Sequence, residues 1–378
     1  MHLLTRDDGG EFRLTEDLFG DDIPEYAILS HRWGAEEVTF RDLMDGTGKS
    51  KAGYDKIRLF AQKVADEQPV STEPSKKILQ HFWVDTCCID QSSSAELSEA
   101  INSMYDWYQK AHVCYAYLAD VSSKAEFARS EWFARGWTLQ ELIAPSTVIF
   151  FDKEWNKLGT KTSLRQELSE RTGIPVDILS GDGLERASIE TASIAQRMSW
   201  AAMRETTRVE DRAYSLMGIF GINMPLVYGE GKRAFVRLQE EIMKVSDDHS
   251  IFAWKSEKEN HGGLLATSPD SFKDSTNIVP SNPFVTYPAP LTVSNRGIHL
   301  AVRFVGTCHP GSGLAILHCA ENGEDDRLIA IHVGDLFLTM QYFGRVQCER
   351  FELLDLREFR PSQYPLRRIC IRRRLLPR

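Results

Sequence analysis

The run Tyr26-Ala27-Ile28-Leu29-Ser30 opens the pattern that decides the fold class of this chain. It is short and apolar, so it predicts a buried strand. Three later runs have the same character: Phe82-Trp83-Val84, Val113 to Leu118, and Val148-Ile149-Phe150-Phe151. Helical patterns separate these runs. The alternation of strands and helices predicts a mostly parallel sheet that is covered by helices on both faces.

Three predicted helices lie between these strands. The first has apolar residues at helical spacing from Tyr54 to Val64. The second begins at Ser93-Ser94-Ala95-Glu96, which has the form of a capping box, and the third runs from Trp137 to Ile143. Sheets of this class bind ligands at the carboxyl ends of their strands, near the point where the strand order reverses. We expect that crevice to be bordered by residues at or just beyond the element ends, namely Ser30, Arg32, Asp85 and Glu141.

Trp137 and Glu141 stand four residues apart, so on a helix they share one face. An aromatic ring beside a carboxylate suits a planar, cationic ligand. The alternative is that Trp137 is a core anchor and Glu141 a solvated helix residue, which is the commoner role of such a pair. Taken alone, this window favours the structural alternative.

Three longer blocks give a stronger signal together. They are Tyr26 to Gly34, Phe82 to Gln91, and Arg135 to Leu142. In this order they resemble the HET (heterokaryon incompatibility) domain of filamentous fungi, over roughly residues 20 to 150. The resemblance implies a protein that triggers programmed cell death when unlike fungal cells fuse.

The same blocks resemble TIR (Toll/interleukin-1 receptor) domains more distantly. The segment from Ile28 to Gly34 is similar to the first strand and loop of TIR domains. Ser130-Glu131-Trp132 and the segment Trp137 to Leu142 resemble the part that carries the catalytic glutamate of NAD-cleaving members. His31 and Trp33 depart from the TIR pattern. The resemblance implies a TIR-like, flavodoxin-like parallel sheet.

The TIR resemblance also implies a role for each candidate residue. Cleavage of the bond between nicotinamide and ribose passes through a ribosyl cation, which the carboxylate of Glu141 would stabilise. The implied substrate contacts are a ring stacked on Trp137, a phosphate held by Arg32, and sugar hydroxyls bound by Ser30 and Asp85. NAD is a substrate in this hypothesis, and no cofactor or metal is predicted. The structural alternatives are that Ser30 caps its strand, Asp85 braces a loop, and Arg32 pairs with Glu36 or Glu37.

Other chemistries have weaker support from the sequence. Cys87 or Cys88 beside a histidine would form a thiol nucleophile pair, but a cysteine next to an apolar strand is usually a packing residue. Asp85 and Asp90 lack a third hard metal ligand nearby in the sequence. Gly231-Lys232 fails the phosphate-loop pattern, because an arginine follows the lysine.

Length, charge and cysteine usage bound the class of protein. The chain has 378 residues, which predicts two or three domains. Its net charge of −9 argues against nucleic acid as the main partner. The seven cysteines form no C-x-x-C pair, and the sequence has neither a signal-peptide core nor a run of about 18 apolar residues. We expect a reduced, cytoplasmic protein without a transmembrane segment.

The expected domain organisation has four parts. Residues 20–155 form the HET/TIR-like domain, and residues 160–248 form a helical extension, which resembles the helical region that commonly follows HET domains. Residues 250–355 form a small antiparallel β module, in which 289–300 is a hairpin. Residues 356–378 are expected as a solvated, arginine-rich tail.

Two functional hypotheses follow. The first is an incompatibility and cell-death effector that cleaves NAD. The second is a non-enzymatic module that triggers cell death by self-association and by contact with other cell-death signalling proteins.

Overall fold

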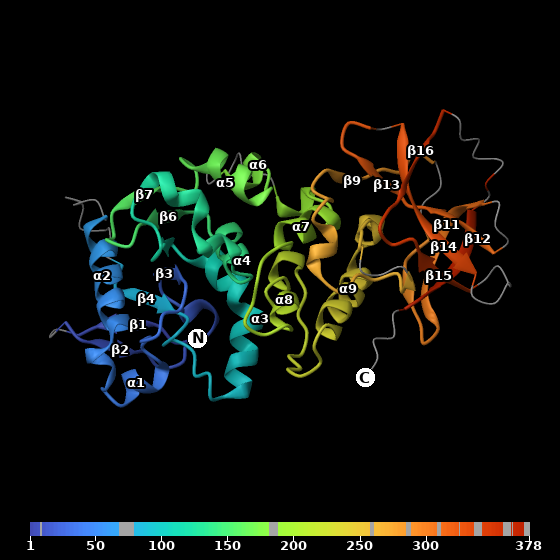
Figure 1. Cartoon of the computed structure of the whole chain (residues 1–378). Coiled ribbons are helices and arrows are strands. Elements are labelled where there is room, and N and C mark those ends of the chain that lie inside the picture. Colours follow the sequence, from blue (N-terminus) through green and yellow to red (C-terminus); the bar gives the residue numbers. More distant parts are fainter. Residues whose placement is uncertain are drawn as a thin grey trace. The chain divides into compact units, whose positions relative to one another are not determined.

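The computed structural model describes residues 1–7, 10–67, 79–180, 188–257, 261–284, 289–307, 311–324, 326–335, 342–357, 364 and 366–373. The chain divides into two compact units, Met1–Ala187 and Ser188–Arg378 (Figure 1). The fold is mixed α/β, with a seven-stranded sheet in the first unit and a separate β sheet in the second. Among the helices of the described residues, none is both long and apolar enough to cross a membrane.

The sheet of the first unit has the strand order β2-β1-β4-β3-β5-β6-β7. Its four central strands are parallel: β3 (Tyr26–His31), β4 (His81–Val84), β5 (Val113–Tyr117) and β6 (Val148–Phe151). The edge strands pair antiparallel: β1 (Leu4–Arg6), β2 (Phe12–Leu14) and β7 (Lys157–Thr160). The expectation of a mostly parallel sheet is therefore right for the centre and wrong for the edges. Strands of three or four residues are too short to give a clear alternation in the sequence.

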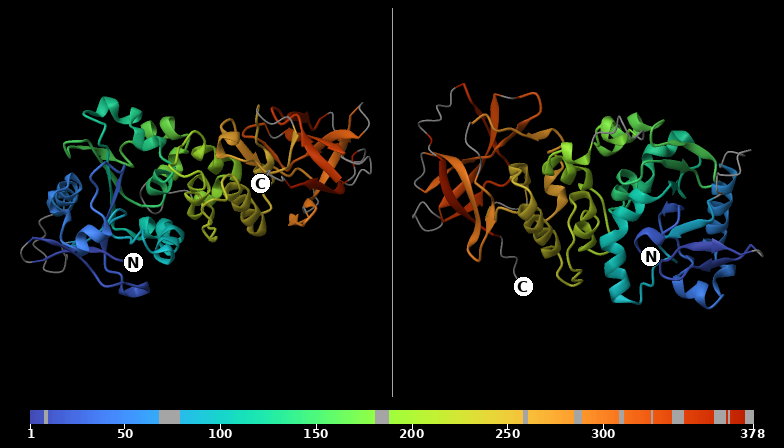
Figure 2. Two further views of the ribbon diagram at one scale, coloured as in Figure 1. Left: turned by 60° about the horizontal axis from the view of Figure 1, so that its bottom comes forward. Right: turned by 180° about the vertical axis from the view of Figure 1, so that it is seen from behind.

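Helices cover both faces of this sheet (Figure 2). The helix α2 (Ala52–Asp66) lies on one face, where Phe60 packs edge-on against Phe82 with ring centroids 5.7 Å apart. The helices α3 (Ser94–Lys110) and α4 (Thr138–Ile143) lie on the other face, where Tyr108 packs against Trp83 at 5.8 Å. Phe82 and Trp83 are neighbours in β4, so successive side chains of one strand serve the two faces.

Helix starts in this unit follow from side-chain caps. The Ser93 hydroxyl accepts the backbone N–H of Glu96 at the start of α3, but Glu96 itself accepts the N–H of Asp90. The predicted capping box is thus half formed. The remaining helices of the unit are α1 (Phe40–Met44), α5 (Arg165–Thr172) and α6 (Val176–Leu179), with 3₁₀ turns η1 (Gly20–Asp22), η2 (Gly48–Ser50), η3 (Lys124–Arg129) and η4 (Glu131–Ala134).

The second unit begins with helices and ends in a β sheet. Its helices are α7 (Ile194–Ala201), α8 (Asp211–Tyr214) and α9 (Arg233–Val245), with 3₁₀ turns η5 (Ile189–Thr191), η6 (Gly218–Phe220), η7 (His249–Phe252) and η8 (Pro269–Phe272). The residues 160–248, expected as one helical extension, contribute α5 and α6 to the first unit and α7 to α9 to the second.

The sheet of the second unit contains a closed ring of five strands. The ring runs β14 (Arg327–Asp335), β12 (Ser312–Ile316), β11 (Gly297–Gly306), β17 (Leu366–Arg372) and β15 (Tyr342–Val346), and β15 pairs back with β14. The other strands are β8 (His261–Gly262), β9 (Ile278–Pro280), β10 (Thr292–Val293), β13 (Cys319–Glu321) and β16 (Glu352–Asp355). The predicted hairpin is present, because β10 pairs antiparallel with β11.

Strand β17 falls within the stretch expected as a basic tail. It pairs antiparallel with β11 and parallel with β15. Ile369 and Ile371 are buried in it, while the flanking Arg367, Arg368 and Arg372 stay exposed. The count of arginines favoured a solvated tail, but the β-branched residues between them decide the structure.

Candidate functional site

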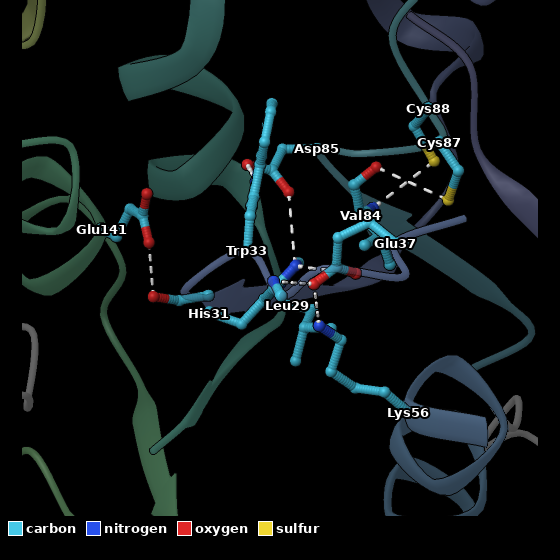
Figure 3. A network of polar contacts seen from close by, with 12 residues as sticks. Leu29, His31, Trp33, Glu37, Lys56, Val84, Asp85, Cys87, Cys88 and Glu141 are labelled. Carbon is cyan, nitrogen blue, oxygen red and sulfur yellow. Dashed lines mark hydrogen bonds and ion pairs between the residues drawn. The ribbon is translucent and has the colours of Figure 1, made fainter. Parts of the chain in front are cut away.

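Two polar clusters meet at the end of β3, around Ser30 and His31. These residues are adjacent in a strand, so their side chains point to opposite faces of the sheet. Ser30 belongs to the Glu141 cluster on the α3/α4 face, which comprises Ser30, Tyr108, Trp132 and Glu141. His31 belongs to the Glu37 cluster, which comprises His31, Glu37, Lys56 and Asp85. Figure 3 shows Glu141 directed at the end of β3, with Glu37 and Asp85 directed at the His31 ring.

The Glu141 cluster is built around one hydroxyl. Ser30 Oγ donates a hydrogen bond to Glu141 Oε2 and accepts one of 2.9 Å from Trp132 Nε1. Trp132 is fully buried, and Glu141 is 5% exposed. Tyr108 reaches the same place from α3, where its hydroxyl donates to the backbone oxygen of Leu29 at 3.2 Å. Strand β3, helix α3, turn η4 and helix α4 thus converge on one carboxyl group.

Burial governs the protonation of Glu141. It raises the pKa of this carboxyl, and the nearby charge of Asp85 raises it further. The hydrogen bond from Ser30 and the positive charge of Arg135 act in the opposite direction. The balance puts the pKa of Glu141 at about 8, against 4.5 for an ordinary glutamate. The carboxyl is therefore mostly protonated at neutral pH.

A tight turn places Trp132 and Glu141 on the same side of Ser30. The hydroxyl of Thr138, the first residue of α4, donates to the backbone oxygen of Trp132 at 2.6 Å and to that of Arg135 at 3.0 Å. This ties the end of η4 to the first turn of α4. Every residue of α4, from Thr138 to Ile143, is buried, so the position of Glu141 is set by packing on all sides.

The Glu37 cluster holds a charged carboxylate instead. Glu37 Oε1 accepts the backbone N–H of Gly34 at 2.6 Å and an ion pair from Lys56 Nζ at 2.5 Å. Its other oxygen lies 3.7 Å from His31 Nε2. Burial raises the pKa of Glu37, but the neighbouring His31, the charge of Lys56 and the Gly34 N–H outweigh it and lower the pKa to about 2.

Asp85 joins this cluster to the loop after β3. Its Oδ2 accepts a 2.7 Å hydrogen bond from Trp33 Nε1, and its Oδ1 lies 3.9 Å from His31 Nε2. Burial raises the pKa of Asp85, while His31 and the Trp33 hydrogen bond oppose this effect. Both ring nitrogens of His31 and Asp85 Oδ1 are buried without a hydrogen-bond partner among the described residues. The His31 ring therefore lies between two carboxylates at ion-pair distance.

The structure brings together some of the residues that the sequence singled out. Ser30 and Glu141 share a hydrogen bond, and Asp85 lies in the neighbouring cluster. Arg32 pairs with Glu131, rather than with Glu36 or Glu37 as the structural alternative had it. Trp137 is partly buried and forms the N-terminal cap of α4.

Several members of the two clusters could not be identified from the sequence. The tryptophan that touches the Ser30 hydroxyl is Trp132, which the sequence offered only as part of a resembling block. Tyr108 lies in the helix that was predicted to begin near Ser93, and the sequence indicated no polar role for it. Glu37 and Lys56 are 19 residues apart, and no local spacing indicates their ion pair.

The described residues do not favour a metal site or a thiol nucleophile. Among them, no group of three His, Cys, Asp or Glu side chains is arranged to hold a metal ion. Cys87 and Cys88 are buried, and burial raises the pKa of the Cys87 thiol well above its usual range, which disfavours a reactive thiolate. What the site offers is a carboxyl group that exchanges a proton near neutral pH, at the C-terminal end of a central parallel strand.

Comparison with known proteins shows which family the first unit resembles. Residues 26–130 match the model of the "Heterokaryon incompatibility protein (HET)" family, and residues 233–278 match a domain of unknown function, DUF8212. Over 258 residues the chain is 49% identical to the vegetative incompatibility protein HET-E-1 of Podospora anserina. This alignment covers 65% of the chain and 18% of that protein, so the chain spans less than a fifth of its relative. No solved structure matches the chain. Residues 26–130 therefore carry a HET domain, as the sequence blocks Tyr26 to Gly34 and Phe82 to Gln91 predicted.

Proposed function

We propose that this protein is a cytoplasmic incompatibility effector that brings about cell death by cleaving NAD at the bond between nicotinamide and ribose. The observation that carries the enzymatic part is Glu141. It is a carboxyl group held by Ser30 beside the end of β3, with a pKa of about 8. A group with a pKa near the working pH is suited to proton transfer in catalysis. The described cysteines are free thiols, which suits a reducing compartment.

The topology of the sheet supports a TIR-like reading of the fold. Numbered along the chain, the four parallel strands β3, β4, β5 and β6 lie in the order second, first, third, fourth. This is the order of flavodoxin-like sheets over four strands, in which ligands bind where the order reverses. That point lies at β3, whose C-terminal residues are Ser30 and His31.

The reaction uses the electrostatics of the Glu141 cluster. When the bond between C1′ of the ribose and the pyridinium nitrogen breaks, the bonding electron pair neutralises the ring and leaves a cation on the ribose. The positive pyridinium next to Glu141 lowers its pKa on binding and favours the carboxylate. The carboxylate then stabilises the ribosyl cation. It also takes a proton from the water whose oxygen bonds to C1′, giving ADP-ribose and nicotinamide.

In this proposal the other predicted residues bind the substrate. Ser30 holds Glu141 and contacts a sugar hydroxyl, Asp85 binds a second hydroxyl, and Trp137 stacks on a ring of the substrate. Arg32 leaves its exposed pair with Glu131 to hold a phosphate, an exchange that costs little because exposed pairs contribute about 0–1 kcal/mol.

The burial of Glu141 favours a second candidate function. A carboxyl that is 5% exposed and hydrogen-bonded to Ser30 also suits a purely structural role. The protein would then be a non-enzymatic module that acts by self-association and by contact with other cell-death signalling proteins. Glu141 would contribute to folding alone.

The test is NAD consumption and nicotinamide release by the purified protein, its Glu141→Gln variant and a Glu154→Gln control. Glutamine keeps the shape and the hydrogen bond of the side chain but loses the charge, so turnover should fall by about a hundredfold or more. Glu154 is an exposed carboxylate of the same unit, so its variant should keep the parent rate.

Cell killing on overexpression separates the two candidate functions. It should follow NAD turnover across the three proteins if the protein is an enzyme. Killing that persists in Glu141→Gln, together with equal or absent NAD turnover in all three proteins, would favour the non-enzymatic module.

A further inference from the structure

Trp33 is exposed at the end of β3, two residues beyond the strand, with 48% of its surface accessible. Single exposed aromatic residues are common and need no explanation. This one differs because its orientation is fixed. The indole Nε1 donates a 2.7 Å hydrogen bond to Asp85 Oδ2, and Asp85 directly follows β4. The polar edge of the ring is thereby tied to the next strand of the sheet (Figure 3).

The loop that carries Trp33 is held by further contacts. The Gly34 N–H donates to Glu37, and Glu37 is paired with Lys56 of α2. Two residues after Glu37, Thr39 forms a complete capping box with Asp42 at the start of α1. The loop is therefore held by α2 through Lys56 and by α1 through the capping box. The exposed Trp33 ring is thus preorganised. A preorganised side chain loses less entropy when a ligand binds.

The charges around Trp33 favour a cation. Hydrogen bonding of an indole N–H to a carboxylate increases the electron density of the ring, and an aromatic face attracts cations. The carboxyl group of Asp85 accepts the indole N–H directly. Trp33 follows Ser30 by three residues at the end of β3, and Ser30 donates the hydrogen bond that holds Glu141, so the ring and Glu141 belong to the same end of this strand.

We propose that Trp33 is the stacking platform for a planar, cationic ring, the pyridinium of NAD, at the site that contains Glu141. The inference rests on the proposed function, since it assigns the nicotinamide end of that substrate. It is distinct from the role given to Trp137, which caps a helix whose own residues are all buried. It predicts a preference that depends on the charge of the pyridine ring.

NAD and NADH form the matched ligand pair. They share adenine, both riboses and both phosphates, and they differ in that the nicotinamide ring of NADH is uncharged. Calorimetry on the Glu141→Gln protein avoids consumption of NAD during the measurement. We expect NAD to bind about tenfold more tightly than NADH, the scale of one cation–π contact.

Three variants in the Glu141→Gln background test the role of the ring. Trp33→Leu should bring the ratio of the NAD and NADH dissociation constants close to one, whereas Trp33→Phe should keep part of the preference. Phe19→Leu is the control. Phe19 is 60% exposed and lines a cavity of about 360 Å³ with Tyr26, at the opposite end of β3, so its loss should leave the ratio unchanged.

The outcomes distinguish this inference from the proposed function. The assignment of Trp33 as the stacking platform is wrong if Trp33→Leu keeps the full preference for NAD. It is also wrong if the Glu141→Gln protein binds NAD and NADH equally. NAD turnover by the parent protein would still uphold the proposed function in that case. A parent protein that neither binds nor cleaves NAD would overturn both.

Discussion

Ser30 and His31 are neighbours in β3, yet the carboxyl groups beside them have opposite charge states. On the α3/α4 face Glu141 is buried, which raises its pKa to about 8, and it is mostly neutral at pH 7. In the other cluster Glu37 has a pKa of about 2 and is charged, because His31, Lys56 and a backbone N–H surround it. The difference teaches that adjacent residues of one strand can lie beside a neutral carboxyl group on one face and a charged carboxylate on the other.

The largest expected effect on the unfolding free energy comes from replacing a tryptophan in each of the two regions. Trp132→Ala empties a fully buried site and removes the hydrogen bond to Ser30, so it should cost about 3–5 kcal/mol of unfolding free energy. Trp33→Ala, at the exposed loop, should cost about 1 kcal/mol or less. Urea unfolding of both variants measures the difference. Equal losses would mean that the loop is as tightly integrated as the core.

The pH dependence of stability should reveal Glu141. Between an unfolded pKa near 4.5 and a folded pKa of about 8, the folded chain holds a proton that the unfolded chain has lost. Stability from this group is therefore complete below the lower value and falls as the pH rises, by about 1 kcal/mol per pH unit. Urea unfolding at pH 5 to 8 should show this fall in the parent and a flatter profile in Glu141→Gln. Parallel profiles would refute the raised pKa.

The contribution of Glu37 to the pH dependence of stability should have the opposite sign and be smaller. Its folded pKa of about 2 lies below the unfolded value, so its contribution is complete above pH 4.5 and is lost as the pH falls toward 2. Glu37→Gln should cost about 1–2 kcal/mol at pH 6 and almost nothing near pH 2, because its surroundings are partly exposed to solvent. A cost that does not change between these two pH values would show that shape, and not charge, matters at this position.

The smallest effect on stability is expected at Arg32. Its pair with Glu131 is exposed on both sides, so Arg32→Ala should change the unfolding free energy by less than about 1 kcal/mol. If Arg32 holds a phosphate of NAD, the same variant should raise KM while leaving kcat nearly unchanged. An unchanged KM would leave Arg32 with the surface pair alone.

Much of the fold of the first unit could be predicted from the sequence. The runs around Tyr26, Phe82, Val113 and Val148 are apolar and well separated, and each forms a strand. The flanking strands β1 and β2 have three residues each, too few for a periodic signal. The pairing of β1 with β4, and of β2 with β1, depends on tertiary contacts that no local pattern encodes.

The candidate site was predictable in part. Motif blocks and strand ends singled out Ser30 and Glu141, which share a hydrogen bond across 111 residues of sequence. Trp132 was not assigned to the site, because a 3₁₀ turn and not a regular helix carries its ring to Ser30. The raised pKa of Glu141 could not be predicted either, since no local pattern shows that every residue of its helix is buried.

The pH dependence of kcat/KM for NAD tests the central claim most directly, because this parameter reports the essential groups of the free enzyme. If the carboxylate form of Glu141 carries the reaction, kcat/KM should rise with pH and level off above a midpoint of about 8, and this limb should be absent from the residual activity of Glu141→Gln. A parent protein whose kcat/KM is flat between pH 6 and 9, or whose midpoint lies near 4.5, would contradict the assignment of Glu141 as the catalytic residue.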